Sequence, residues 1–282
     1  MMRNPKHYYR PKTLDEAIKL ANQPKTLAIA GGALAFGALE IPYDTFIDLQ
    51  DVRELKQISY ETYGISIGGA VTLQQVVEIP DLPVSLRRSI TRTIPLNIRN
   101  NATVGETLMV KNPLREWNAA LVALHDDAYT AVTYNYSGNN WETSTSPLLE
   151  GFGEALGTVI VTHLILPILR NRQALGAAFV ARTPTDDPIV NAAVCVWLNE
   201  SRVVSWAQAG LGGVSDRPVI RVDLRTLEGK PIDEANIAHA ANFVTTFAKP
   251  VGDYLGSAEY RRGMARVTVQ RALMECKQQL GL

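Results

Sequence analysis

The sequence predicts an α+β protein with two domains, and three observations support this. The chain has 282 residues, which is too long for one small core and suits two domains, or one domain with a sizeable appendage. Short apolar strands that run into glycine turns alternate with helices in the first part of the chain. A β-hairpin pattern followed by two helices occupies the last part.

The N-terminal segment reads as helix, strand, glycine turn and strand. Residues 13–16 form a capping box, in which a hydroxyl is followed three residues later by Glu, and they predict a helix that Pro24 ends. Residues 27–30 predict a short apolar strand running into Gly31-Gly32. Residues 45–49 predict the next strand.

A second block opens with residues 65–71, which alternate apolar and small side chains as a strand does. Short helices are expected after Thr72 and after Pro83. Residues 98–105 read as a loop. The apolar run at residues 159–166 predicts a buried strand, because it is too short to span a membrane and contains His163.

The third block begins near Arg170. Residues 192–198 and 202–209 predict a hairpin around residues 199–201. Two helices follow. The first is expected to have one apolar face and the second to begin at the N-cap Ser257 with an apolar stack. The predicted faces are Ile237, Ala241, Val244 and Ala248 in the first helix, and Tyr260, Met264, Val267 and Met274 in the second.

Composition excludes several classes of protein. The 46% hydrophobic and 20% charged residues are ordinary for a globular chain, and 28 basic residues balance 28 acidic ones. This balance gives no reason to expect a nucleic-acid partner. We expect no membrane span and a cytoplasmic location, because the N-terminus lacks the apolar core of a signal peptide. Two distant cysteines cannot supply the roughly four thiolates of an iron–sulfur cluster, so any redox chemistry needs an organic cofactor.

Two glycine segments are suited to cradle a pyrophosphate. These are Ala30-Gly31-Gly32 and Thr103-Val104-Gly105. Glycine allows unusual backbone dihedrals and close approach, so that backbone N–H groups can face an anion. Neither segment is a GxGxxG fingerprint, and each alone is also compatible with an ordinary tight turn.

Six segments, taken in order, resemble one family. Residues 30–35 are similar to its Ala-Gly-Gly-Thr-Asp-Leu loop, and residues 98–108 to its Ile-Arg-Asn-x-Ala-Thr-Ile-Gly-Gly-Asn-Leu loop. Similarity continues over four further segments. These are residues 46–49, 67–73, 209–214 and 257–262. The chain therefore resembles the flavoprotein subunits of the carbon monoxide dehydrogenase and xanthine dehydrogenase group of molybdenum hydroxylases.

The resemblance implies a fold and partners. A PCMH-type α/β FAD-binding domain over residues 1–172, in subdomains of about 1–56 and 57–172, would be followed by a three-stranded antiparallel sheet with a helical bundle over residues 173–282. FAD would lie between the two subdomains. The partners would be an iron–sulfur subunit and a molybdopterin subunit, in a heterotrimer that is commonly dimerised. The chain would relay electrons from the iron–sulfur clusters to an external acceptor, with no catalytic side chain of its own.

The resemblance also implies which residues contact FAD. The first loop would contribute Ala30, Gly31, Gly32, Ala33, Leu34 and Ala35. The second loop and its surroundings would contribute Thr103, Val104, Gly105, Thr107 and Glu116. Leu34 and Ile160 would be apolar neighbours of the isoalloxazine, and Phe179 is a weaker candidate for stacking on it.

Both loops depart from the family pattern. The polar pair of the first loop is Ala33-Leu34 here, and the Gly-Gly-Asn of the second loop is Gly105-Glu106-Thr107. At about 4 Å and an effective dielectric of about 20, repulsion between Glu106 and a phosphate is on the order of 4 kcal/mol unless Glu106 turns outward.

Two hypotheses follow from these departures, and a third stays open because other flavin folds of the same broad type are self-contained enzymes. In the first, FAD binds through the backbone donors of both loops. In the second, the chain is a flavin-free scaffold or interaction subunit. In the third, it is a self-contained flavin oxidase or reductase, although no acid or base stands out for that role.

Overall fold

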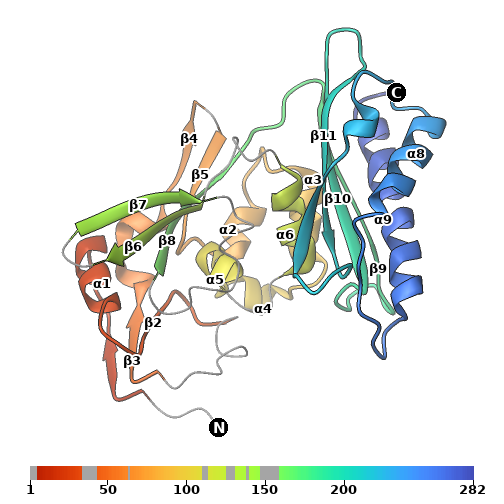
Figure 1. Ribbon diagram of the computed structural model, residues 1–282. Coiled ribbons are helices and arrows are strands. Elements are labelled where there is room, and N and C mark those ends of the chain that lie inside the picture. Colours follow the sequence, from red (N-terminus) through yellow and green to blue (C-terminus); the bar gives the residue numbers. More distant parts are fainter. Residues whose placement is uncertain are drawn as a thin grey trace. The chain divides into compact units, whose positions relative to one another are not determined.

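The computed structural model divides the chain into two compact units (Figure 1). The first contains residues 1–80, 94–113 and 126–167, and the second contains residues 81–93, 114–125 and 168–282. The predicted division at residue 172 refers to the family's domains and stays a prediction. The residues that the structure describes are 5–33, 43–62, 64–109, 114–124, 131–137, 140–146 and 159–282.

A small parallel sheet with one helix begins the first unit. Its strand order is β1-β3-β2, and α1 (Leu14–Ala21) follows β1. The Thr13 hydroxyl accepts a hydrogen bond from the Glu16 N–H, so the predicted N-cap is confirmed. The Glu16 carboxylate accepts from the Lys12 N–H, one residue earlier than in the standard capping box. The strands are β1 (His7–Tyr9), β2 (Thr26–Ile29) and β3 (Thr45–Asp48).

An antiparallel sheet of five strands among the described residues forms the rest of this unit's framework. Its order is β4-β5-β8-β6-β7, so the predicted strand at residues 159–166 lies at its centre. All five residues of β5 are buried. The strands are β4 (Ile58–Glu61), β5 (Gly64–Gly68), β6 (Ala131–Ser137), β7 (Asn140–Ser146) and β8 (Val159–Leu166).

Short helices complete the first unit. α2 (Leu73–Val77) follows Thr72 as predicted, and Thr72 and Gln75 cap it reciprocally. The expectation that residues 98–105 form a loop is wrong at both ends. This segment contains the end of α4 (Leu96–Arg99) and the start of α5 (Val104–Met109). α4 begins directly after Pro95, a residue that favours the first turn of a helix.

The second unit contains an antiparallel sheet of order β12-β11-β10-β9. The predicted hairpin is confirmed, because β10 pairs with β11 from Asn191 opposite Gly212 to Leu198 opposite Val204. Within the described residues the sheet has four strands instead of the three that we expected, because β12 pairs with β11. The strands are β9 (Gln173–Val180), β10 (Val190–Leu198), β11 (Val204–Gly212) and β12 (Val219–Asp223).

Helices pack against this sheet. The predicted apolar face of α8 (Glu234–Val244) is confirmed, since Ile237, Ala241 and Val244 are buried in the core. The other helices are α3 (Val84–Thr91), α6 (Arg115–Ala123) and α9 (Ala258–Gln279). Short 3-10 helices lie in both units. They are Leu49–Asp51 and Arg53–Lys56 in the first unit and Arg225–Leu227 in the second.

The apolar face that we predicted for α9 is not its buried face. Tyr260 is 41% exposed and Met274 is 49% exposed. The helix instead buries a stripe of mostly small residues, because its backbone lies close to β9. The buried residues are Arg261, Ala265, Thr268, Val269, Ala272, Leu273 and Cys276.

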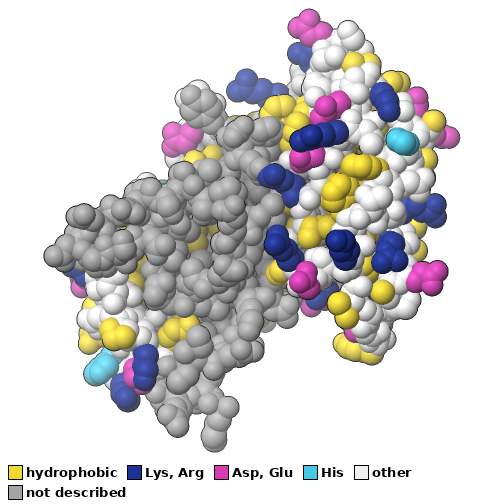
Figure 2. All heavy atoms as spheres, viewed as in Figure 1, with side chains coloured by type: hydrophobic (Ala, Val, Ile, Leu, Met, Phe, Trp, Pro, Cys, Tyr) yellow, Lys and Arg dark blue, Asp and Glu magenta, His cyan; other side chains and the backbone are white. Residues whose placement is uncertain are grey.

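On the visible face of the part that contains α8 and α9, cationic and anionic side chains are interspersed (Figure 2). None of the helices in the described part of the chain has the length and hydrophobicity needed to cross a membrane.

Candidate functional site

The first glycine loop follows β2 and has unused backbone donors. Gly31 and Gly32 have φ values of 105° and 72°, which are in the region that favours glycine. Among the described residues, the N–H groups of Gly31, Gly32 and Ala33 donate to no protein acceptor. Gly32 is buried, and buried backbone N–H groups are nearly always paired. This loop therefore has the properties of a ligand-binding turn.

The second glycine loop lies against the first. A Cβ on Gly31 would be 2.0 Å from the carbonyl oxygen of Asn101, so only glycine fits at position 31. The segment after Asn101 is held by residues that follow β5. The Leu73 N–H donates to the Ala102 carbonyl at 2.8 Å, and the Val104 N–H donates to the Val71 carbonyl at 3.0 Å. The structure thus brings the two predicted loops together within one unit.

The donors of the second loop are already used inside the protein. The Gly105 N–H donates to the Gly69 carbonyl at 2.8 Å, and a Cβ on Gly105 would be 2.9 Å from that oxygen. The Thr107 N–H donates to the Thr103 carbonyl at 3.2 Å, and the Thr107 hydroxyl donates to the Val104 carbonyl at 2.7 Å. The N–H groups of Gly105 and Thr107 are therefore already used. The predicted donation from this loop to a pyrophosphate has no free backbone donor at these two positions.

Glu106 does not turn outward. The residue is 6% exposed, and its Oε2 accepts a hydrogen bond from the Thr103 N–H at 3.3 Å. This is half of a capping box at the start of α5. The Thr-x-x-Glu spacing at residues 103–106 could have revealed it in the sequence, as the same spacing did at residues 13–16.

Thr103 contributes a second unusual feature. Its hydroxyl oxygen is buried and has no hydrogen-bond partner among the described residues. The residue is 2% exposed. A buried hydroxyl without a partner is costly, so this atom is a candidate for contact with a bound group.

The remaining predicted contacts lie in different places. Ala30 and Ile160 are both buried in the same hydrophobic core cluster, beside Ala70. Val104 is fully buried. Leu34 and Ala35 lie outside the described residues, and Ala33 is half-buried at the edge of the described segment. The proposed roles of these residues toward FAD stay predictions.

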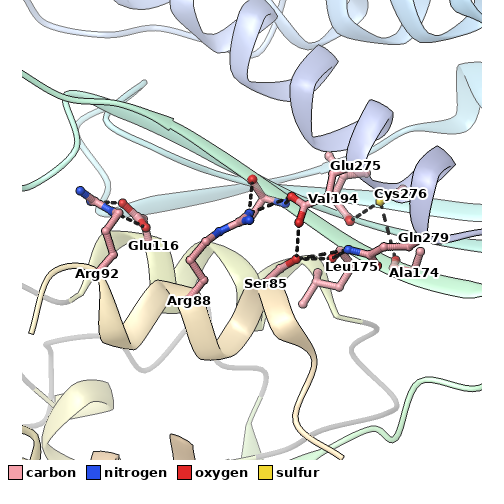
Figure 3. A network of polar contacts seen from close by, with 11 residues as sticks. Ser85, Arg88, Arg92, Glu116, Ala174, Leu175, Val194, Glu275, Cys276 and Gln279 are labelled. Atoms are coloured by element: carbon pink, nitrogen blue, oxygen red, sulfur yellow. Dashed lines mark hydrogen bonds and ion pairs between the residues drawn. The ribbon is translucent and has the colours of Figure 1, made fainter. Parts of the chain in front are cut away.

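Glu116 lies in the second unit and has a partner that the sequence did not indicate. The Arg92 guanidinium binds its carboxylate through two N–H groups (Figure 3). Arg92 also donates to the carbonyls of Pro184 and Asp186 and lies 3.8 Å from the centroid of the Phe179 ring. Burial raises the pKa of Glu116, and Arg92 opposes this shift. Phe179 is therefore stacked on a protein cation.

The same network continues along α3. Ser85 donates to the Leu175 carbonyl, and Arg88 donates to the Ala177 carbonyl and to the carboxylate of Glu275. In Figure 3 these side chains point from α3 toward β9 and α9. The spacing of Ser85, Arg88 and Arg92 places them on one helix face, which attaches α3 to the C-terminal sheet.

FAD fits one loop better than the other. The N–H donors of the first loop have no acceptor in the described ranges, and its two glycines have positive φ values. The Thr103 hydroxyl lies in the adjoining loop. These features suit a pyrophosphate. The carboxylate of Glu106, in contrast, would repel a pyrophosphate. No cluster of three or more potential metal ligands occurs within the described ranges.

Two families match the chain. The family described as "FAD binding domain in molybdopterin dehydrogenase" matches residues 2–167. The family described as "CO dehydrogenase flavoprotein C-terminal domain" matches residues 178–276. Together these families indicate FAD binding and confirm the resemblance drawn from the sequence segments.

Two curated relatives match over nearly their whole length. The glyceraldehyde dehydrogenase medium chain of Sulfolobus acidocaldarius is 25% identical, and the match covers 95% of this chain and 97% of the relative. The carbon monoxide dehydrogenase medium chain of Afipia carboxidovorans is 24% identical, with 96% of each chain covered.

Solved structures confirm the predicted fold class. A Cu,Mo-CO dehydrogenase chain has a TM-score of 0.82 at 19% identity, with 98% of this chain and 100% of that chain covered. A chain of quinoline 2-oxidoreductase from Pseudomonas putida 86 has a TM-score of 0.80 at 23% identity, with both chains fully covered.

Proposed function

Because this chain belongs to the family of FAD-binding domains in molybdopterin dehydrogenases, we propose that it relays electrons from the iron–sulfur clusters of a partner subunit to an external acceptor. The substrate would be oxidised at the molybdenum centre of another partner subunit. The observation in the structure that carries this proposal is the first glycine loop, whose N–H donors have no acceptor in the part of the protein that the structure describes. We also propose that the protein is located in the cytoplasm.

The residues of this chain would bind and orient the cofactor. When bound, FAD can take up single electrons and release them in pairs. The N–H groups of Gly31, Gly32 and Ala33 would donate to its pyrophosphate, and the Thr103 hydroxyl would donate to a neighbouring oxygen. Ala30 and Ile160 would form the apolar wall behind the loop, since both are buried in one cluster. No side chain of this chain is assigned a proton transfer.

The flavin spectrum of the isolated protein tests this proposal. We expect the purified chain, titrated with FAD, to bind the cofactor and to shift the visible absorbance of the flavin. The flavin-free scaffold subunit predicts no flavin in the protein and no uptake of added FAD. The self-contained oxidase or reductase predicts rapid substrate-dependent turnover, such as NAD(P)H consumption, without partner subunits.

Gly31→Ala tests the first loop. The new Cβ would meet the Asn101 carbonyl oxygen, and alanine is disfavoured at a φ of 105°. We expect FAD affinity to fall by at least about tenfold, because both effects displace the loop's donors. The measurement is the quenching of flavin fluorescence during titration.

Gly229→Ala is the matched control for this variant. Gly229 also has a positive φ, of 73°, but a Cβ there meets nothing within 4 Å. Its substitution should leave FAD affinity unchanged. Equal affinity of the Gly31→Ala variant and the unmodified chain would show that the first loop does not hold the cofactor.

A further inference from the structure

The second glycine loop is closed by a carboxylate of its own helix. Glu106 is the third residue of α5, and its Oε2 accepts from the Thr103 N–H. Carboxylates are favoured at helix N-termini because they face unpaired N–H groups there. With 6% of its surface exposed, Glu106 is held at this position by the surrounding protein.

The neighbouring N–H groups also donate to acceptors within the protein. Val104 and Gly105 donate to the carbonyls of Val71 and Gly69, so the start of α5 is fixed to the segment after β5. The first loop differs in this respect, because its three N–H groups have no acceptor among the described residues. The described part of the first loop therefore has N–H groups available to an anion, whereas the second loop already holds the Glu106 carboxylate.

The first and second glycine loops are in direct contact. The carbonyl of Asn101, two residues before Thr103, lies over Gly31. A pyrophosphate on the donors of Gly31 and Gly32 would therefore lie in the same unit as the Glu106 carboxylate and near the segment that precedes α5. Like charges in a partly buried site repel each other, and added salt weakens this repulsion in part.

We propose that Glu106 sets the affinity of this subunit for FAD, by taking up the backbone donor at the start of α5 and by repelling the cofactor's pyrophosphate. The second loop is then ordered without the cofactor, and FAD is held weakly enough to exchange. This inference rests on the proposed function, since it concerns the affinity for a cofactor that the subunit binds.

Glu106→Gln provides the direct test. Glutamine keeps a side-chain oxygen that can accept from the Thr103 N–H, and it removes the charge. We expect the dissociation constant for FAD to fall by at least about tenfold relative to the unmodified chain. The gap between the two proteins should narrow as salt is added. The measurements are flavin fluorescence quenching and isothermal titration calorimetry with FAD.

Glu16→Gln is the matched control. Glu16 is also the third residue of its helix, and its carboxylate also accepts a backbone N–H, that of Lys12 at 3.0 Å. It lies on α1 and contacts neither glycine loop in the described contacts. Its substitution changes the net charge equally and should leave FAD affinity unchanged.

A second readout uses the protein without cofactor. Loss of the carboxylate at the start of α5 should lower the melting temperature of the FAD-free chain while it tightens FAD binding. Glu106→Gly is the second variant if Glu106→Gln does not fold, and the same tightening is expected of it.

The possible outcomes separate this inference from the proposed function. If Glu106→Gln binds FAD as the unmodified chain does, or more weakly, the inference is wrong and the proposed function stands. The same holds if Glu16→Gln tightens binding equally, since the effect is then one of net charge. If the unmodified chain and both Glu106 variants take up no FAD, the proposed function fails, and the inference fails with it.

Discussion

Arg92→Met lowers the free energy of unfolding by about 3–5 kcal/mol, the range found when one partner of a buried ion pair is removed. The side chains of Arg92 and Glu116 are 9% and 10% exposed. Without Arg92, the carboxylate of Glu116 stays in a buried position with its main compensating charge lost. The carbonyls of Pro184 and Asp186 also lose a donor. Chemical denaturation monitored by circular dichroism measures the change.

The size of this loss depends on pH. Burial already raises the pKa of Glu116 against the opposing effect of Arg92, so the pKa rises further in the variant. A raised carboxyl pKa favours the protonated form in the folded protein. The stability linked to it is present below the unfolded-state pKa and is lost as pH rises through the folded-state pKa. The difference between Arg92→Met and the unmodified chain should therefore shrink as pH falls into the acidic range.

Two further variants show whether the loss comes from the buried pair. Arg182 forms an ion pair with Asp186 at 3.5 Å, but its side chain is 63% exposed. Arg182→Met should therefore change stability by less than about 1 kcal/mol. In the double variant Arg92→Met/Glu116→Leu the charge is gone, and much of the lost stability should return. If the double variant is as unstable as the sum of the single variants, Arg92 does not act through Glu116.

Local signals in the sequence predicted the elements that depend on short-range chemistry. Thr13 and Ser257 cap their helices because a side-chain oxygen needs only the N–H three residues later. The turn at Gly31-Gly32 was predicted because glycine after an apolar strand permits positive φ values. The hairpin of β10 and β11 followed from two largely apolar stretches on either side of a polar turn.

Contacts between distant segments could not be predicted in this way. Arg92 and Glu116 belong to separate helices, and no local spacing indicates that they pair. The burial of Glu106 is an intermediate case, since the spacing to Thr103 indicates a capping contact but not its burial. The sequence therefore raised the conflict between Glu106 and FAD, and the structure was needed to show which way the side chain points.

The buried face of α9 was missed because it is decided by close backbone approach and not by hydrophobicity. A face of larger apolar residues was expected to pack. Instead, Gly176 in β9 lets the helix backbone approach the sheet, and the small residues Ala272 and Cys276 line the contact. Large side chains on the same face would hold the helix away from the strand.

Gly176→Val should be among the most destabilising single substitutions in this chain. A Cβ at position 176 would be 2.0 Å from the carbonyl oxygen of Ala272 and 3.0 Å from Sγ of Cys276. The first neighbour is helix backbone, which moves only if α9 itself shifts away from β9. Overpacking in a core costs about 1–3 kcal/mol and occasionally more, and we expect a loss of at least about 3 kcal/mol here because the clash is with backbone.

The control is a glycine on the same helix. Gly263 lies within α9, and a Cβ there meets nothing within 4 Å. Gly263→Ala should raise the free energy of unfolding by about 0.5–1 kcal/mol, because alanine favours the helix and fills open space. Both changes in the free energy of unfolding are measured by denaturation of the FAD-free chain. Opposite signs for the two variants would show that stability depends on the close approach of α9 to β9 more than on the helix propensity of α9. A loss below about 1 kcal/mol for Gly176→Val would mean that the helix can move away from the strand, and that the small-residue stripe is not what fixes its position.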